Sequence, residues 1–146
     1  MNDDYKIRLA VSEDAGEIAR LLTLLGHPAS AADIQERWQH WAAEGNTCFV
    51  AQSGGGPLGG IVTLHRMRVL HRPRPVGRIT ALVVEQALRG QGVGRALVRY
   101  AESYLSHSGC GLLEITSNVS LKQAHAFYQH LGYERSSERF SKVLTQ

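Results

Sequence analysis

A short segment rich in glycine and arginine, residues 89–95 (RGQGVGR), is the part of the sequence best suited to bind an anion. It follows an almost continuously apolar stretch, residues 79–84, and precedes residues 93–107, whose apolar positions repeat at helical spacing. Glycine lets the backbone come close to a ligand, and the first amides of a helix have no partner inside the helix. A strand, a glycine turn and a helix start in this order therefore predict a pyrophosphate site.

Three interpretations compete for this turn. A dinucleotide fingerprint, G-x-G-x-x-G, fits Gly90 and Gly92 but has Arg95 in place of its third glycine. A phosphate-binding P-loop requires a lysine that the segment lacks. An ordinary strand-to-helix turn rarely needs three alternate glycines, here including Gly94. The turn alone thus predicts an anion site without identifying the ligand.

The elements that must position the turn alternate between strand and helix patterns. Their order, β-α-α-β-β-β-α-β-α-β-β, predicts a mixed α/β (α+β) sheet with helices on both faces. A length of 146 residues predicts a single domain over residues 1–146. We expect strands at residues 5–11, 47–52, 58–65, 79–84 and 112–117, a helix at 93–107, and a last hairpin from Tyr133 through Phe140 to Leu144.

Composition excludes several classes of protein. Hydrophobic residues make up 43% and charged residues 20% of the chain, which is typical of globular domains and not of disordered or fibrous ones. No apolar run approaches the length of a membrane span, and residues 1–4 lack the pattern of a signal peptide. Cys48 and Cys110 are far apart and have no CxxC partner, so we expect no metal site. A cytoplasmic location without a membrane partner is the expectation.

Several motifs together resemble one family, the GNAT superfamily of N-acetyltransferases. Arg89, Gly92 and Gly94 match its [QR]-x-x-G-x-[GA] signature. Residues 127–133 look like its F-Y-x-x-x-G-[FY] segment, and Asn118 matches a common polar position after a buried strand. The resemblance covers nearly the whole chain. It implies a mostly antiparallel sheet of six to seven strands, with a V-shaped opening between two central parallel strands, residues 79–84 and 112–117.

The same resemblance implies a site for acetyl-CoA and an amine acceptor. The pantetheine arm would bond to the backbone of the strand before the turn, and the pyrophosphate would lie on the amides of the turn. Arg89 and Arg95 would add charge-assisted contacts. Tyr128 resembles the general acid that protonates the leaving thiolate. The implied cofactor-binding residues are Leu82, Val83, Val84, Arg89, Gly90, Gln91, Gly92, Val93, Gly94, Arg95 and Asn118.

The general base is not assigned by the resemblance. Many relatives carry a glutamate in the strand before the turn, whereas this chain has Thr80, Ala81 and Leu82. Glu85 and Glu114 lie nearby in the expected sheet, and both also fit solvated carboxylates. Water relayed from a backbone carbonyl is an equal alternative.

An arginine-rich connection between two expected strands bears on the acceptor. It contains no acidic residue and no aromatic residue, so it fits either a rim that attracts an anionic acceptor or a solvated loop, and not a nucleic-acid surface. The segments around 116–119, 124–128 and 132–134 resemble the aminoalkylphosphonate N-acetyltransferase branch, a pattern that GNAT enzymes with other acceptors share. The arginines are Arg66, Arg68, Arg72, Arg74 and Arg78.

The sequence therefore predicts an acetyl-CoA-dependent transfer to the primary amine of a small acceptor that also carries an anionic group. The alternatives are a non-catalytic acyl-CoA-binding sensor module, or an acetyltransferase that acts on a protein or aminoglycoside amine. Small members of the superfamily are often dimers, so the resemblance allows a homodimer.

Overall fold

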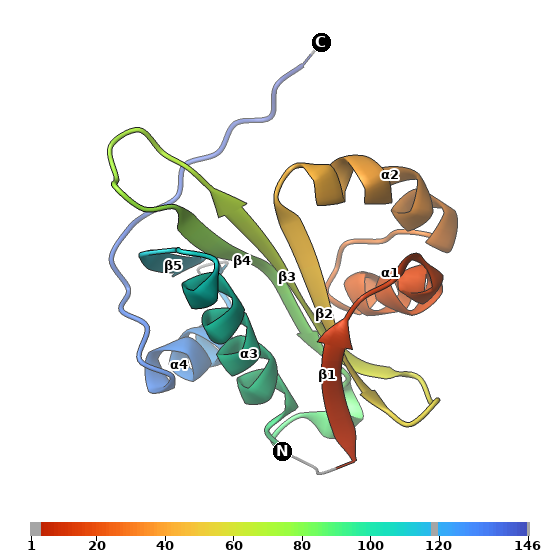
Figure 1. Ribbon diagram of the computed structural model, residues 1–146. Coiled ribbons are helices and arrows are strands. Elements are labelled where there is room, and N and C mark those ends of the chain that lie inside the picture. Colours follow the sequence, from red (N-terminus) through yellow and green to blue (C-terminus); the bar gives the residue numbers. More distant parts are fainter. Residues whose placement is uncertain (1–3, 118–119, 146) are drawn as a thin grey trace. The chain divides into compact units, whose positions relative to one another are not determined.

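A mixed sheet forms the centre of the fold (Figure 1). The computed structural model describes residues 4–117 and 120–145. The sheet has five strands in sequential order, and all neighbours are antiparallel except the parallel pair β4–β5. This confirms the predicted mixed, mostly antiparallel sheet, with five strands where six to seven were expected. The strands are β1 (Tyr5–Leu9), β2 (Asn46–Ser53), β3 (Leu58–Met67), β4 (Val76–Val84) and β5 (Leu112–Ile115).

The chain divides into two compact units, Met1–Ile115 and Thr116–Gln146. The first contains the whole sheet, and the second contains the helix α4 (Lys122–His130). Among the described residues after α4, none belongs to a strand, so the expected hairpin over residues 133–144 was wrong. Tyr133 and Phe140 are the only strongly apolar residues in 133–140, which offers too narrow an apolar surface to bury a strand.

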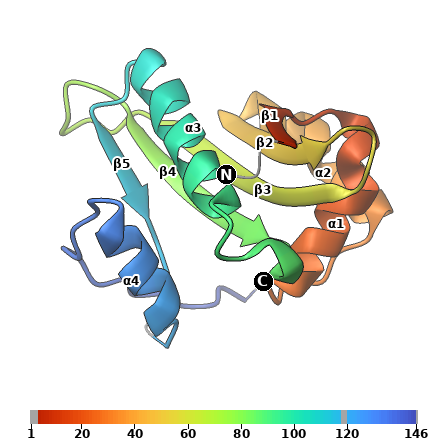
Figure 2. The ribbon, with the colours of Figure 1, turned by 90° about the horizontal axis from the view of Figure 1, so that it is seen from below.

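Helices cover both faces of the sheet in the first unit (Figure 2). The helices α1 (Ala15–Leu24), which follows the short 3-10 turn η1 (Ser12–Asp14), and α2 (Ala31–Ala43) bury one face. The helix α3 (Val93–His107) packs on the other, where Phe49 meets the rings of Tyr100 and Tyr104 edge-on. The core on the α1 side consists of Ala10, Ala15, Ile18, Ala19, Leu21, Ile34, Cys48, Val50, Leu58, Ile61 and Val83.

The two cysteines are free thiols. Cys48 is buried in the core, and burial raises the pKa of its thiol to about 12. A thiol that stays protonated in an apolar core behaves as a small hydrophobic residue.

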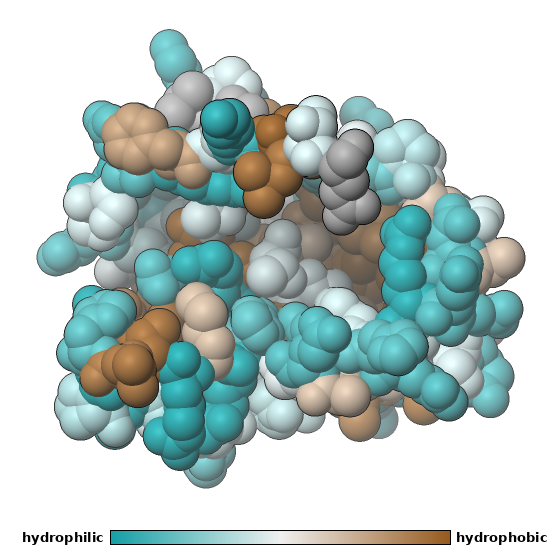
Figure 3. All heavy atoms as spheres, turned by 90° about the horizontal axis from the view of Figure 1, so that it is seen from above, coloured by the Kyte–Doolittle hydropathy of each residue, from teal (hydrophilic) through white to brown (hydrophobic). Residues whose placement is uncertain are grey.

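Among the described helices, none is long and apolar enough to cross a bilayer. In the view of Figure 3, most of the exposed residues are hydrophilic, and hydrophobic residues occur in small separate groups.

Strand β4 changes its pairing halfway along. Its first part, Val76 to Ile79, pairs with β5, whereas residues 80–84 have no strand partner on that side within the described chain. At the same point the register with β3 shifts, because Thr63 lies opposite Ala81 while Leu64 lies opposite Ile79. Pairing between the two parallel strands therefore ends at Ile79 and Ile115, which leaves the rest of β4 open on the side where the predicted opening would lie.

Gly60 allows α3 to lie close to the sheet. A Cβ at this position would lie 2.9 Å from the backbone oxygen of Val83 and 3.0 Å from Cδ1 of Leu97. Glycine is therefore needed for this close approach of helix and strand.

We predict that Gly60→Ala lowers the free energy of unfolding by about 1–3 kcal/mol, because the added methyl group meets a backbone atom and a packed leucine. Thermal unfolding followed by circular dichroism measures the loss. Gly55→Ala is the matched control, since a Cβ there has nothing within 4 Å. An unchanged melting temperature for Gly60→Ala would contradict the packing argument.

Candidate active site

The glycine turn joins β4 to α3 through the short 3-10 helix η2 (Gln86–Leu88). Gly90 and Gly92 adopt left-handed backbone angles, with φ of 79° and 85°. Gly92 is the N-cap of α3 and provides no side chain to cap the helix. Other residues at these two positions would be strained, so the conformation itself explains why the turn contains glycine.

The turn presents backbone donors. The first α-helical bond of α3 runs from the amide of Ala96 to the carbonyl of Gly92, at 3.0 Å. Helix geometry leaves the amides of Val93, Gly94 and Arg95, which precede it, without an intrahelical acceptor. The positive end of the helix dipole lies at the same place. These donors and the dipole together suit a phosphate group.

Two arginines flank these amides. Arg89 and Arg95 are both exposed, and neither forms an ion pair within the part of the chain that the structure describes. Their guanidinium groups are thus available to an anion. The side chain of Gln91 is committed instead to the turn, since its Nε2 donates to the carbonyl of Ala87 at 3.2 Å.

The unpaired edge of β4 leads directly into this turn. Leu82 and Val84 are half-buried and Val83 is buried, while their backbone on the β5 side has no strand partner among the described residues. The amide of Glu85 donates to the carbonyl of Gly59 at 2.8 Å and ties the end of β4 to β3. An extended ligand could therefore pair with β4 as an added strand and place its anionic end on the turn.

The remaining predicted site residues belong to the second unit. Tyr128 lies on α4, with ring contacts to Phe127 at 5.4 Å and to Tyr133 at 6.2 Å between centroids. Burial raises the pKa of the Tyr128 phenol above its usual value. The phenol is therefore protonated at neutral pH, as a proton donor must be. Asn118 lies outside the described residues.

Glu85 is held in an ion-pair network. Its Oε1 lies 2.7 Å from Nη1 of Arg20, whose Nε lies 2.8 Å from Glu17. Glu17 also accepts a hydrogen bond from the amide of Leu58 at 2.9 Å. Hydrogen bonding to Glu17, and also to Glu85, raises the pKa of Arg20. The ion pair of Glu85 with Arg20 joins α1 to the end of β4.

Glu114 has a different environment. It lies on β5 directly opposite Arg78 of β4, and Nη2 of Arg78 is 3.8 Å from its Oε1. This pair lies next to Ile79 and Ile115, the last residues through which the two strands pair. Sequence patterns had not shown that the two side chains are neighbours.

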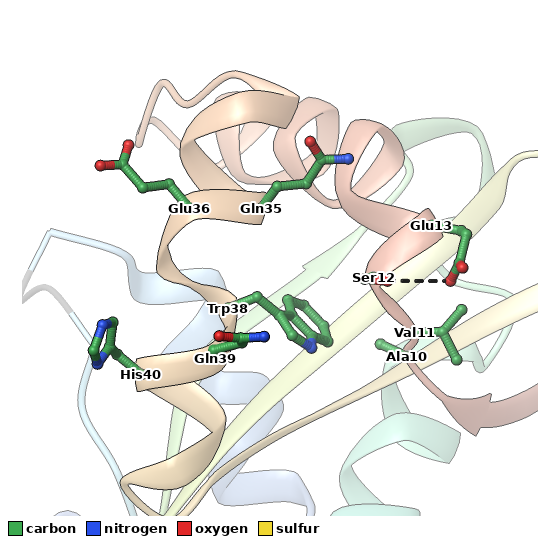
Figure 4. A pocket seen from close by; sticks show the side chains of 9 residues that line it. All are labelled: Ala10, Val11, Ser12, Glu13, Gln35, Glu36, Trp38, Gln39 and His40. Atoms are coloured by element: carbon green, nitrogen blue, oxygen red, sulfur yellow. Dashed lines mark hydrogen bonds between the residues drawn. The ribbon is translucent and has the colours of Figure 1, made fainter.

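Two hollows in the first unit lie away from the turn. Figure 4 shows one, of about 660 Å³, where Trp38 of α2 faces the chain that follows β1. The other, of about 680 Å³, extends from Leu9 toward Tyr104 of α3. Both adjoin the Leu9 end of β1, whereas Tyr5, at the opposite end, packs with Leu88 over Gly59. Neither hollow includes the glycine turn or residues 80–84.

The arginine-rich connection lies at the far end of β4 from the glycine turn. Arg68, Arg72 and Arg74 are exposed on the loop between β3 and β4. Arg66 donates from Nε to the carbonyl of Ser108 at 3.0 Å. Only Arg78 lies on β4 itself, next to the opening, so the expectation of a rim formed by all five arginines near the site does not fit this arrangement.

Comparison with known proteins gives one consistent family. The profile of the Acetyltransferase (GNAT) family matches residues 12–133. The aminoalkylphosphonate N-acetyltransferase of Salmonella typhimurium is 29% identical over 140 residues, covering 95% of this chain and 91% of that protein. The aminoglycoside N(6')-acetyltransferase type 1 of Stenotrophomonas maltophilia is 29% identical over 136 residues, covering 89% and 86%.

Solved structures agree on the fold. An acetyltransferase of Trypanosoma brucei superposes with a TM-score of 0.86 at 23% identity, covering 97% of this chain and all of that one (100%). The glucosamine-6-phosphate N-acetyltransferase of Arabidopsis thaliana gives a TM-score of 0.83 at 19% identity, covering 97% and 99%.

We predict that Gly92→Val abolishes binding of coenzyme A, because a branched side chain would occupy the space above the helix amides and strain a left-handed residue. Isothermal titration calorimetry with coenzyme A measures the loss. Gly109→Val is the control, since Gly109 has a similar φ of 88° and open space around its Cβ position but lies at the other end of α3. Unchanged affinity in a folded Gly92→Val protein would exclude the turn as the binding site.

Proposed function

The chain belongs to the GNAT family of acetyltransferases, and we propose that it transfers an acetyl group from acetyl-CoA to the primary amine of a small acceptor. The observation that carries this proposal is the continuity of the unpaired edge of β4 with the glycine turn. One long ligand with an extended arm and an anionic end fits both features. Coenzyme A has this form.

In this proposal the pyrophosphate receives hydrogen bonds from the amides of Val93, Gly94 and Arg95, with Arg89 and the Arg95 side chain adding charge. The pantetheine arm pairs with the backbone of residues 82–84. At a rise of about 3.3 Å per residue, Thr80 lies about 13 Å from Val84 along β4. In this proposal the arm runs along β4 toward Thr80, and the thioester lies near Ile79, where the pairing of β4 with β5 ends.

The reaction is a direct attack of the amine on the thioester carbonyl. A new C–N bond forms, the C–S bond breaks, and the thiolate of coenzyme A leaves. An alkyl amine has a pKa of about 10.4, so its neutral form lies about 4–5 kcal/mol uphill at neutral pH. The nucleophile therefore needs a proton acceptor, and the thiolate needs a proton donor.

Tyr128 is the proposed proton donor. It corresponds to the tyrosine of the family segment at residues 127–133, and burial raises the pKa of its phenol, which keeps the proton available. For the proton acceptor, we favour Glu114 or a water molecule over Glu85, because Glu85 forms an ion pair with Arg20.

The acceptor class separates this proposal from its alternatives. One relative is named for an aminoalkylphosphonate, another for an aminoglycoside, and a further one is an N-alpha-acetyltransferase of Arabidopsis thaliana. We favour a small amine that also carries an anionic group. A single domain over residues 1–146, a cytoplasmic location and a homodimer stay predictions.

A panel of amines tests this function directly. Release of free thiol from acetyl-CoA should depend on the amine, with aminoalkylphosphonates or amino acids preferred over aminoglycosides and peptides. Binding of acetyl-CoA without thiol release for any amine would instead support a non-catalytic acyl-CoA sensor.

We predict that Tyr128→Phe lowers kcat by about 10²–10⁴-fold, because a positioned proton donor contributes this much to the rate. The affinity for coenzyme A should change little, since only a hydroxyl group is removed. Tyr133→Phe, on the neighbouring ring of the same unit, is the control and should keep kcat within about threefold. A Tyr128→Phe enzyme with normal kcat would show that Tyr128 only packs.

A further inference from the structure

A group of polar side chains lies on the face of the sheet opposite α3, beside the point where β4 and β5 part. His65, Arg78 and Glu114 are direct partners across β3, β4 and β5, so their side chains project to the same face. Gly77, the neighbour of Arg78 on β4, faces Leu105 of α3, which shows that Arg78 projects away from that helix.

Two threonines extend this group toward the unpaired part of β4. Oγ1 of Thr63 and Oγ1 of Thr80 lie 2.7 Å apart, which places both hydroxyl groups on one face of the sheet. Thr63 lies two residues before His65 on β3, so its side chain is on the same face as that of His65. Beyond these residues the face becomes apolar, since Ile61 and Val83 pack in the core under α1.

Arg78 has unused hydrogen-bonding capacity. Its Nε is buried and has no hydrogen-bond partner among the residues that the structure describes. The separation of 3.8 Å from Glu114 is too long for a hydrogen bond. The ion pairs of Arg8 with Asp14 and of Arg20 with Glu85, by contrast, have N–O distances of 2.8 and 2.7 Å. A buried donor without an acceptor is unfavourable, so an acceptor supplied by a ligand would be stabilising.

Both charges of this loose pair are suited to one zwitterionic ligand. Arg78 offers a planar guanidinium group, which matches the oxygens of a carboxylate or phosphonate. Glu114 offers a carboxylate for an ammonium group. The side chains are about one-third and two-fifths exposed, with side-chain values of 36% and 43%, so a small solute can reach them. His65 is already engaged, because its Nε2 lies 3.2 Å from the carbonyl of Glu44.

We propose that Arg78 and Glu114 bind the acceptor and determine its class: a short-chain primary amine that bears a carboxylate or phosphonate. Arg78 binds the anionic group, and Glu114 holds the amine next to the opening. This inference rests on the proposed function, because the thioester reaches the neighbouring residue Thr80 only if the arm of coenzyme A lies along β4. A polycationic acceptor would place an ammonium against Arg78 and is disfavoured.

The first test compares matched amines, 2-aminoethylphosphonate and propylamine, by kcat/KM. Arg78→Gln should raise KM for the phosphonate about 10- to 100-fold, the value of a hydrogen-bonded charge pair, and leave KM for propylamine and for acetyl-CoA unchanged. Arg78→Lys keeps the positive charge but lacks the planar guanidinium group. Its KM for the phosphonate should therefore lie between those of the unaltered protein and Arg78→Gln. Glu114→Gln should raise KM for both amines.

Arg72→Gln is the matched control, because it removes one exposed arginine from the loop at the other end of β4. It should leave both KM values unchanged. Equal losses with both amines in Arg78→Gln, or the same loss in Arg72→Gln, would overturn the assignment. Circular dichroism of each variant checks that the fold is kept.

Direct binding separates this inference from the proposed function. If the unaltered protein releases no thiol with any amine, the proposed function fails. Calorimetric titration of the coenzyme A-loaded protein with 2-aminoethylphosphonate then decides the inference by itself. Binding that is lost in Arg78→Gln and kept in Arg72→Gln supports the site. Absence of binding to the unaltered protein overturns it.

Discussion

The hydrogen bonds of β4 set the arrangement on which the rest of this site depends. Along Val76 to Ile79 the strand is paired on both sides, by β3 and by β5. Along residues 81–84 it is paired only with β3, and Thr80 is skipped by the register shift between the two strands. A strand edge with open amides and carbonyls is normally a liability in a folded domain. Here the open edge is short, and only Glu85 and the 3-10 helix η2 separate it from the glycine turn, so the proposed extended ligand could contact both.

The irregularity at Thr80 gives the two halves of β4 different surroundings. Gly77 faces Leu105 of α3, whereas Val83 packs in the core under α1, although both positions are odd-numbered. One extra residue between them reverses which face the later side chains reach. In the half of β4 that pairs with β5, the side chain of Arg78 therefore projects away from α3. In the half without this partner, the side chain of Val83 projects to the same face and packs in the apolar core. Neighbouring elements fix the end of the strand, since Arg20 of α1 binds Glu85 and Gly60 lets α3 approach.

The parts of this structure that sequence predicted are those that local chemistry decides. The glycine turn and the helix Val93–His107 follow from residues close together in the chain. Local chemistry also explains the start of α2, where Ser30 and Asp33 form a capping box. The predicted strand began at residue 79, whereas β4 begins at Val76, because Gly77 and Arg78 interrupt the apolar pattern. Pairing with β3 and β5 keeps these residues extended although their local β-propensity is low. The neighbours Arg78 and Glu114 come from strand register, which no local pattern contains.

Distance also decides which arginines can influence the reaction. Arg72 belongs to the exposed loop that precedes Val76, and Val76 itself is about 13 Å from Thr80 along the strand at about 3.3 Å per residue. Solvent-exposed charges are largely screened beyond about 8 Å at physiological ionic strength. The loop arginines therefore contribute to the general positive charge of the protein, formally +3, and little to the potential at the opening. Arg78 lies two residues from Thr80 and is partly buried, so its charge is screened least where the acetyl group would be transferred.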